Sequence, residues 1–491
     1  MKNYIKIILP LLIFNVFANC SHALDILYPQ QKIHKTTSDV TYIMGNVSPS
    51  STLTINGEQI KVWENGAFCK TVKLKEGDNI FKITENTGNN KYSEEYQIKR
   101  IIPDKSINVK NTKNIPQIEI FENLKYATVT NEGAPIRKSP DDNADRITHL
   151  PKDTVLFING KLKDWYKISS GDNSSEYWIY SKNINILYDL NNPPVSSVKT
   201  ACFSKNKTFS ELKIKLDYPV MFKTKEENNN IYLTLFGIKD IASLEKVISK
   251  QKIFKGLKIT ENKNNNVTIF IPSAAPLWGY QSLYKENTFI FKRKNTPKFN
   301  KKHPLKNITI TIDPGHGGKE LGAVGPTRIP EKDINLSISK KLKTALEKEG
   351  AKVILTRKDD SLLDLYARPE IANKHNSLIC LSIHANSLVD KDPYEKHGIS
   401  TFYYHPQAKE LARQIKIQMI NDLKLKDDFH NYASFVLTRP TMPLSVLVEV
   451  AYMPHPEEYL MLNNPDFQEK AANSICEGVK NYIKSTMPQN K

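Results

Sequence analysis

The hydrophobic pattern of this 491-residue chain changes near residue 307, and this change constrains the fold more than any other feature. Before it, short runs of alternating apolar and polar residues are separated by turn residues, which is typical of β-sheets. After it, such runs alternate with stretches in which apolar residues recur every third or fourth position, which is typical of helices. We therefore predict three small all-β domains followed by a C-terminal α/β domain, with a largely parallel sheet flanked by helices.

Three stretches before residue 307 carry the β pattern. In the first, Asn56-Gly57 separates two alternating runs and predicts a tight hairpin, because both turn positions need a positive φ. The turns of this stretch resemble those of bacterial immunoglobulin-like modules. The second stretch has a Trp165-Tyr166 pair and resembles the small bacterial barrel of Src-homology type, although such aromatic residues also simply fill small cores. The predicted domains are an immunoglobulin-like β-sandwich over residues 24–105, a small β-barrel over 120–190 and a β-rich domain over 196–294.

A basic segment joins these domains to the C-terminal part. Residues 292–306 contain seven Lys or Arg and two Pro, so we predict a solvated linker over 295–306 and the α/β domain over 307–487. The formal net charge of +18 suits an anionic environment such as the cell envelope. Basic residues are not interleaved with a nucleic-acid motif, so no nucleic-acid partner is expected. The five scattered cysteines form no C-x-x-C pair, which argues against a thiolate zinc site.

The N-terminus has the features of a secretory signal. Lys2 and Lys6 precede an apolar stretch that runs from Ile7 to Phe17, and Ser21-His22-Ala23 is a small-x-small cleavage site. We predict a signal peptide over residues 1–23, and an exported protein without a stable membrane span after cleavage. Cleavage after Ala18, an uncleaved anchor and lipidation at Cys20 are the alternatives. We expect a periplasmic location, with a secreted or wall-associated protein as the alternative.

Two histidines follow predicted strands of the C-terminal part. His316 lies in Asp313-Pro314-Gly315-His316-Gly317-Gly318, directly after the strand predicted at 308–312, and His384 ends the strand predicted at 378–383. Open α/β sheets keep their sites at the carboxyl ends of strands, and the glycines let the chain turn sharply beside His316. Either histidine alone would be read as a surface residue, but their shared placement favours a common site.

A carboxylate lies between the two histidines in the sequence. Glu331 stands just before a helix predicted over 333–349, where a loop could bring it to the same sheet edge. Two imidazoles and one carboxylate are a common ligand set for catalytic zinc, which leaves a position for water. Such a water has a pKa near 7 instead of about 15.7. The set therefore predicts hydrolysis.

Glu449 stands within the apolar run 445–452. A carboxylate buried there without a partner would lose several kcal/mol of hydration, so it needs a partner or a purpose. One purpose is to act as the base beside zinc-bound water, a role that a raised pKa favours. The alternative is an ion pair with a nearby arginine such as Arg368 or Arg439.

At this point the resemblance to a family is specific. Residues 307–487 resemble the catalytic domain of zinc-dependent N-acetylmuramoyl-L-alanine amidases, which strip stem peptides from peptidoglycan. The matching phrases occur in the family's order: 313–318, 331–336, 353–357, Arg368 with Ala372-Asn373, 382–386 and 447–449.

The resemblance implies a role for each matching residue. His316, Glu331 and His384 would hold one Zn²⁺, and Glu449 would be the catalytic acid/base. The substrate would be peptidoglycan, cut between N-acetylmuramic acid and L-alanine. The resemblance also suggests that Asp313, Arg368 and Asn386 support the ligands or contact the substrate, although each could equally be a structural hydrogen bonder.

Two departures from the family pattern are informative. Where the family usually has a Glu-Arg pair before the Ala-Asn, the chain reads Tyr366-Ala367-Arg368-Pro369, so no role for the missing acid is carried over. Some members also have a long helical insertion that plugs the zinc until an activator binds, whereas only ordinary elements fit between Asn386 and Ser445. We therefore expect no obligatory activator, and control by localisation through the β-domains. The β-rich domain predicted over 196–294 resembles domains that target wall amidases to their substrate.

Two other functions stay open. Metal chemistry alone does not name the amide, so one alternative is a zinc peptidase that acts on the stem peptide. The other is a non-catalytic wall-binding scaffold with a dead enzyme domain, which the intact ligand set and base disfavour.

Overall fold

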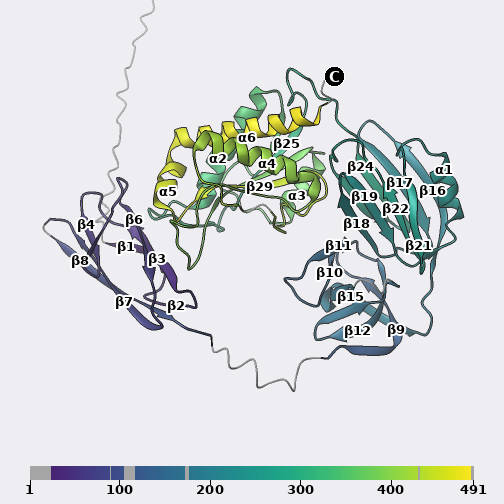
Figure 1. Ribbon diagram of the computed structural model, residues 1–491, viewed down its shortest axis with the longest axis horizontal. Coiled ribbons are helices and arrows are strands. Elements are labelled where there is room, and N and C mark those ends of the chain that lie inside the picture. The colour runs from purple at the N-terminus through teal and green to yellow at the C-terminus, as the bar shows by residue number, and fades with distance from the viewer. Residues whose placement is uncertain (1–23, 89, 104–116, 172–175, 430–431, 488–491) are drawn as a thin grey trace, which may run out of the picture. The chain divides into compact units, whose positions relative to one another are not determined.

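The computed structural model describes residues 24–88, 90–103, 117–171, 176–429 and 432–487 (Figure 1). The predicted signal peptide, including Cys20, lies outside the described residues. The chain divides into two compact units: unit 1 comprises residues 1–102 with the short segments 325–328 and 389–392, and unit 2 comprises the rest. No helix in the described part of the chain is long and apolar enough to cross a membrane.

Unit 1 consists of two antiparallel-rich sheets around one apolar core that includes Ile43, Leu53 and Phe68. The strand orders are β1-β3-β6 and β2-β8-β7-β4-β5. The predicted hairpin is confirmed, because Asn56 (φ 49°) and Gly57 (φ 84°) alone separate β4 from β5. The strands are β1 (Asp25–Tyr28), β2 (Ile33–Thr36), β3 (Val40–Asn46), β4 (Thr52–Ile55), β5 (Glu58–Ile60), β6 (Ala67–Lys73), β7 (Gly77–Asn86) and β8 (Lys91–Arg100).

Polar contacts hold the two short segments within unit 1. Arg328 donates two hydrogen bonds to the Asp25 carboxylate, at 2.6 and 2.7 Å. The Asp390 carboxylate accepts hydrogen bonds from the Tyr28 hydroxyl at 2.7 Å and the Thr41 hydroxyl at 2.8 Å, and lies 3.0 Å from the His34 imidazole. Unit 1 is therefore built from three separate stretches of the chain.

Unit 2 begins with a seven-stranded sheet of order β11-β10-β14-β13-β12-β9-β15. Tyr177 and Trp178 are fully buried, so the aromatic residues of this stretch do fill its core. The strands are β9 (Glu119–Val129), β10 (Ala134–Arg137), β11 (Arg146–Leu150), β12 (Val155–Leu162), β13 (Trp165–Ile168), β14 (Trp178–Tyr180) and β15 (Ile184–Leu190).

The next part of unit 2 has two sheets, of orders β20-β16-β17-β24-β23 and β18-β19-β22-β21. This part also contains one helix that was not expected, α1 (Ala242–Lys250), which lies between β20 and β21. Ile241, Leu244 and Ile248 pack into the core at helical spacing, a signal that was present in the sequence. The strands are β16 (Ser196–Lys205), β17 (Phe209–Leu216), β18 (Phe222–Glu227), β19 (Asn230–Leu235), β20 (Ile238–Lys239), β21 (Lys258–Lys263), β22 (Asn266–Ile271), β23 (Tyr280–Lys285) and β24 (Thr288–Lys294).

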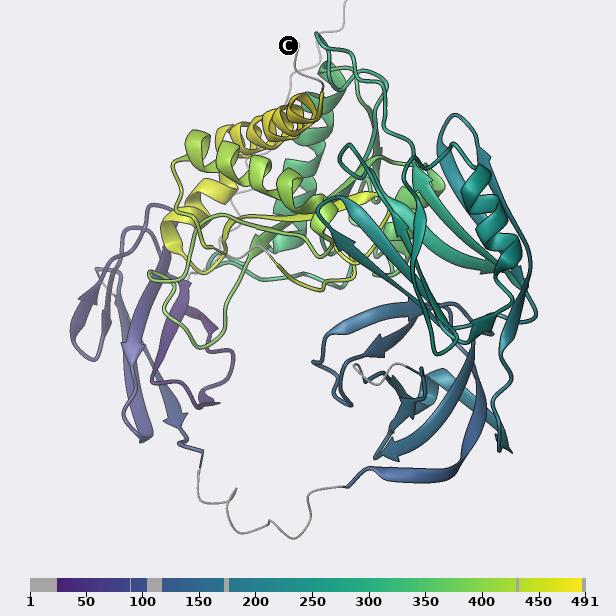
Figure 2. The ribbon, with the colours of Figure 1, turned by 45° about the vertical axis from the view of Figure 1, so that its right-hand side comes forward.

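The C-terminal part of unit 2 contains one mixed sheet of order β26-β25-β27-β29-β28. The first four strands pair in parallel, and β28 pairs antiparallel with β29. Helices α2, α4 and α6 pack together over this sheet (Figures 1 and 2). The elements are β25 (Thr309–Pro314), α2 (Glu331–Lys348), β26 (Lys352–Leu355), α3 (Ala367–Lys374), β27 (Ile379–Asn386), β28 (Ser400–Phe402), α4 (Lys409–Leu423), β29 (Leu444–Tyr452), α5 (Pro456–Asn463) and α6 (Pro465–Thr486).

Three details of the C-terminal part differ from the sequence-based expectations. Helix α2 begins at Glu331, two residues earlier than predicted, so the carboxylate belongs to the helix rather than to a loop. The alternating pattern of residues 434–437 predicts a strand, but these residues form none. A turn at 436–438 lies there instead, where the Thr438 hydroxyl bonds to Phe435 N at 3.0 Å and to Ala433 O at 2.7 Å. The segment 295–306 is not fully solvated, since Leu305 is completely buried in the C-terminal core.

Hydrogen bonds within unit 2 join the third β-rich part to the C-terminal part. Tyr280 N donates to Thr441 O at 3.1 Å, and the Thr441 hydroxyl donates back to Tyr280 O at 2.6 Å. Gln407 N donates to the buried Glu226 carboxylate at 2.9 Å. Burial raises the pKa of Glu226 to about 7, against the opposing effect of the Gln407 hydrogen bond.

Glu226→Gln is expected to stabilise unit 2 at alkaline pH. The pKa of Glu226 is about 7 in the folded chain, whereas the ordinary value of 4.5 applies in the unfolded chain. Between pH 4.5 and pH 7, the folded chain therefore keeps a proton that the unfolded chain has released. Stability is therefore lost as pH rises through this window, by on the order of 3 kcal/mol, and glutamine removes the loss. Thermal unfolding of the wild type and of the variant at pH 5 and at pH 8 measures this loss of stability. The exposed neighbour Glu227→Gln is the control, and an equal pH dependence in both variants would contradict the prediction.

Candidate active site

The structure brings His316, Glu331 and His384 together at one edge of the C-terminal sheet. The Glu331 carboxylate lies between the imidazoles, with Oε1 3.0 Å from Nδ1 of His384 and Oε2 3.1 Å from Nε2 of His316. One ligand atom from each residue lies within 4.8 Å of the other two. The side chains of the predicted ligand set therefore converge, and their spacing suits a single metal ion.

Two glycines make room for this convergence. A Cβ atom at Gly315 would lie 2.2 Å from the His384 ring, and one at Gly322 would lie 2.4 Å from Oε2 of Glu331. His316 itself adopts φ of 60°, a conformation that non-glycine residues rarely take. Such local strain persists only where surrounding contacts over-determine the conformation, and it clusters at functional sites.

The electrostatics of the three side chains are coupled. Burial alone would raise the pKa of Glu331, but hydrogen bonds from both histidines outweigh it and lower that pKa well below the ordinary value. Burial alone would likewise lower the pKa of His384, but the hydrogen bond and charge of Glu331 outweigh it and raise the pKa to about 9. A metal ion that binds here must therefore displace a proton from His384 at neutral pH.

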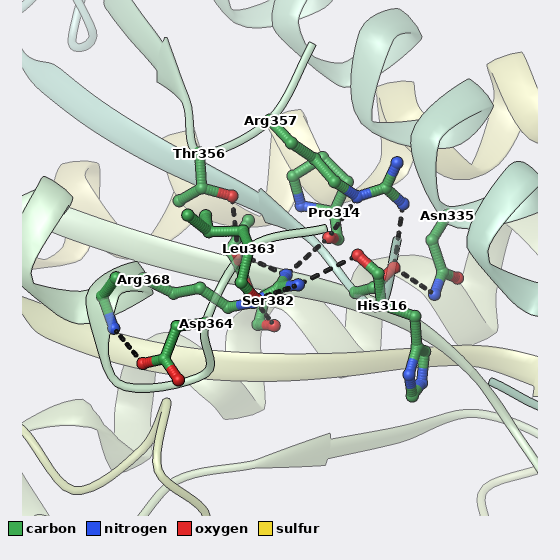
Figure 3. Close-up of polar contacts among 12 residues, drawn as sticks. Pro314, His316, Asn335, Thr356, Arg357, Leu363, Asp364, Arg368 and Ser382 are labelled. Atoms are coloured by element: carbon green, nitrogen blue, oxygen red, sulfur yellow. Dashed lines mark hydrogen bonds and ion pairs between the residues drawn. The ribbon is translucent and has the colours of Figure 1, made fainter. Parts of the chain in front are cut away.

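Two residues that the sequence did not single out orient the side chains of this candidate site. Asn335 is buried and donates to Oε1 of Glu331 at 3.0 Å, and it lies one helical turn after Glu331 on α2, which is the signal that could have found it. Arg357 is also buried, and it donates to Pro314 O at 3.0 Å and to Gly315 O at 2.9 Å (Figure 3). Both residues fix the chain that carries His316 and Glu331.

Asp313 and Arg368 form a buried ion pair beneath the His316 loop. Nη1 of Arg368 lies 3.0 Å from Oδ1 of Asp313, and Nη2 donates to His316 O at 2.9 Å (Figure 3). The hydroxyls of Thr356 and Ser382 donate to the same carboxylate at 2.6 and 2.8 Å. These contacts indicate that Asp313 and Arg368 are structural hydrogen bonders rather than substrate contacts, since Asp313 is surrounded by donors of the protein itself.

Arg368→Ala is expected to destabilise unit 2 by about 3–5 kcal/mol, because Asp313 would keep a buried charge without its partner. Thermal unfolding of the whole chain measures the loss. Arg413→Ala is the matched control: Arg413 pairs with Glu410 at the surface, where an ion pair contributes about 0–1 kcal/mol. Equal decreases in the unfolding temperature of both variants would show that the buried ion pair stabilises the fold no more than the surface pair does.

Glu449 lies on β29 directly opposite His384 on β27. Its Oε2 is buried and has no hydrogen-bond partner among the described residues, and burial raises the pKa of this carboxyl to about 8, against the opposing charge of His384. The expected arginine partners are engaged elsewhere, Arg368 with Asp313 and Arg439 with Ser434. A buried carboxyl group with one unpaired oxygen beside these three side chains is the arrangement that an acid/base residue needs.

Asn386 ends β27, but its side chain turns to the backbone of the next residue. Its Oδ1 accepts a hydrogen bond from Ser387 N at 2.8 Å. In the described part of the chain it makes no hydrogen bond to His316, Glu331 or His384, and its contact with the substrate stays a prediction.

A second group of potential ligands, His397, His455 and Glu458, has a structural explanation. The Glu458 carboxylate accepts hydrogen bonds from Tyr452 N at 2.7 Å and Gly398 N at 3.3 Å, and lies 2.7 Å from the His397 imidazole. Nδ1 of His455 accepts from Glu458 N at 3.3 Å and so caps α5. Both oxygens of Glu458 and Nδ1 of His455 therefore serve structural contacts.

The C-terminal part of unit 2 is similar to proteins of a known family. The family model described as N-acetylmuramoyl-L-alanine amidase matches residues 310–481. In Bacillus subtilis strain 168, the uncharacterized protein YqiI is 33% identical over 180 residues, which cover 36% of this chain and 86% of YqiI. The germination-specific N-acetylmuramoyl-L-alanine amidase of the same organism is 30% identical over 199 residues, 37% of this chain and 81% of that protein.

A third relative shows the limit of the match. The N-acetylmuramoyl-L-alanine amidase LytC of Bacillus subtilis is 33% identical over 187 residues, which cover 37% of each protein. The similarity thus spans little more than a third of LytC, and in this chain it is confined to the C-terminal part of unit 2. Through that part, the chain belongs to the N-acetylmuramoyl-L-alanine amidase family.

Proposed function

We propose that this protein hydrolyses the amide bond between N-acetylmuramic acid and L-alanine in peptidoglycan. The observation that carries the proposal is the convergence of His316, Glu331 and His384 beside the unpaired carboxylate of Glu449, within the residues that match the amidase family. Metal ligands and an acid/base residue together are the groups that hydrolysis of an unactivated amide needs.

The three convergent side chains suit one zinc ion. Two imidazoles and one carboxylate are a ligand set of catalytic zinc sites, and Asn335 supplies the supporting hydrogen bond that keeps Glu331 oriented. When bound, zinc would polarise the scissile carbonyl and lower the pKa of a water molecule to about 7. Glu449 would take the proton of the attacking water and pass it to the nitrogen of the leaving L-alanine.

The parts of the chain before residue 307 are proposed to hold the enzyme on its substrate. We propose an exported protein that acts in the periplasm, or at the wall if it is secreted, in remodelling, turnover or cell separation. The three β-rich parts would bind the polymer or direct the chain to it, and no activator protein would be required for cleavage.

Product analysis tests this function. Residues 24–491 are incubated with purified peptidoglycan, and the soluble products are identified by mass spectrometry. Stem peptides with a free L-alanine amine are expected, and their release should stop with a chelator and resume when zinc is added back. Shortened muropeptides would instead identify a peptidase acting on the stem peptide, and binding without any product would identify a scaffold.

A further inference from the structure

A cavity of about 770 Å³ lies within unit 2, away from the proposed zinc ligands. Residues from all three parts of unit 2 line it, among them Arg146 and His149 of β11, Tyr280 of β23, and Tyr404, Tyr432 and Arg439 of the C-terminal part. The Tyr404 hydroxyl donates to Arg146 O at 3.2 Å, which joins two walls of the cavity. The cavity is thus formed by the packing of the β-rich parts against the amidase-like part.

Arginine residues concentrate positive charge at this cavity. Two arginines line it: Arg146 lies 3.3 Å from His149 Nε2, and Arg439 donates to Ser434 O at 2.8 Å. In the described part of the chain, neither arginine has a carboxylate within ion-pair distance.

The arginines also repel one another. Burial, and next the charge of Arg146, lower the pKa of Arg439. Burial and the same arginines lower the pKa of His149 to about 3, so this imidazole adds no charge. Two carboxylates, Glu132 and Glu226, also line the cavity, but neither pairs with Arg146 or Arg439 in the described part of the chain. Cations that repel one another without carboxylate partners are stabilised when an anion binds between them.

The cavity also reaches the chain that carries the proposed active site. Tyr366 and Pro369 line it, and they flank Arg368, whose guanidinium holds the backbone of His316. Tyr366 is 65% exposed, so its ring is free to contact a ligand. A polymer bound at the zinc ligands could therefore extend past Tyr366 into the cavity.

We propose that this cavity binds a carboxylate of the peptidoglycan stem peptide whose amide bond is cut at the zinc site. Arg146 and Arg439 would pair with the carboxylate, because planar guanidinium groups match its two oxygens. Tyr366, Tyr404 and Tyr432 would pack against the apolar parts of the peptide. This inference rests on the proposed function and adds a specificity site to it: the β-rich part that carries Arg146 would select the substrate.

Binding to a chain that does not cleave tests the cavity separately from the chemistry. In the Glu449→Ala background, fluorescence polarisation compares a labelled muramoyl stem peptide that has free carboxylates with the same peptide carrying carboxamides. The free acid is expected to bind about 10–100-fold more tightly, the range for hydrogen bonds to a charged group. Adding Arg146→Gln should remove most of this preference, whereas Arg413→Gln, at the surface of α4, should preserve it.

Each outcome has one meaning. Equal binding of acid and amide by the unaltered cavity would overturn the proposal, and this comparison needs no arginine variant that might unfold. A preference that survives Arg146→Gln would also overturn it. Displacement of the free acid by a phosphate polymer at equal or lower concentration would assign the cavity to a different anion. Failure of the proposed function shows itself separately, as absence of stem-peptide release by the wild-type chain.

Discussion

Glu449→Ala is expected to lower the rate of stem-peptide release by about 10²–10⁴-fold, the usual contribution of a general acid/base. The carboxylate lies opposite His384 and has a buried, unpaired oxygen, so alanine removes the proton carrier and leaves no new unpaired group. Because Glu449 is not one of the three convergent ligands, the variant should still bind one zinc ion per chain. Release rates on purified peptidoglycan, together with zinc content, measure both expectations.

The control for this variant is another glutamate in the same part of the chain. Glu347 on α2 is exposed and pairs with Lys343 one helical turn away, so Glu347→Ala should leave the rate within a factor of two or so of the wild type, as surface substitutions usually do. A Glu449→Ala chain that kept its activity would remove Glu449 from the mechanism. One that lost its zinc would make Glu449 a ligand instead.

His384→Ala is expected to remove both zinc and activity. His384 is one of the three proposed ligands and lies 3.0 Å from Glu331, so its loss would leave an incomplete set and one unpaired side of a buried carboxylate. Zinc content after dialysis should fall from one ion per chain to background, and release should fall to the level of the chelated protein. His375→Ala, at the exposed end of α3, is the matched control and should retain both.

The same histidine sets the pH dependence of metal loading. Glu331 raises the pKa of His384 to about 9 in the metal-free chain, so the proton competes with zinc below that pH. Apparent zinc affinity should therefore fall as pH is lowered from 9, and zinc binding should release a proton to the buffer. Affinity that did not change between pH 6 and pH 9 would show that His384 does not take part.

The sequence predicted the candidate site better than the surrounding packing. His316, Glu331, His384 and Glu449 stand at strand ends, at a helix start or within a strand, where local pattern alone defines the position. The regular helix α2 buries Ile334, Ile338, Leu342 and Leu346, as its spacing indicated. Local pattern did not reveal the turn at 436–438, where the Thr438 hydroxyl donates a hydrogen bond to Ala433 O.

Roles that depend on distant partners could not be read from the sequence. Asp313 and Arg368 were candidates for substrate contact, and only their mutual ion pair, 55 residues apart in the chain, favours a structural role. The cavity that contains Arg146 and Arg439 joins residues from parts that the sequence separated into different domains. Such arrangements depend on tertiary packing, which no residue pattern encodes locally.

Unit 1 has a consequence for how truncated forms of this protein should behave. Two of its three stretches are short loops of the amidase-like part: Arg328 precedes Glu331 by three residues, and Val389 follows His384 by five. A fragment trimmed to the amidase-like part would keep Arg328 and Asp390 but lose Asp25, Tyr28 and Thr41, which hold them. An isolated fragment of that kind would therefore lack the hydrogen-bond partners that the full chain gives to Arg328 and Asp390.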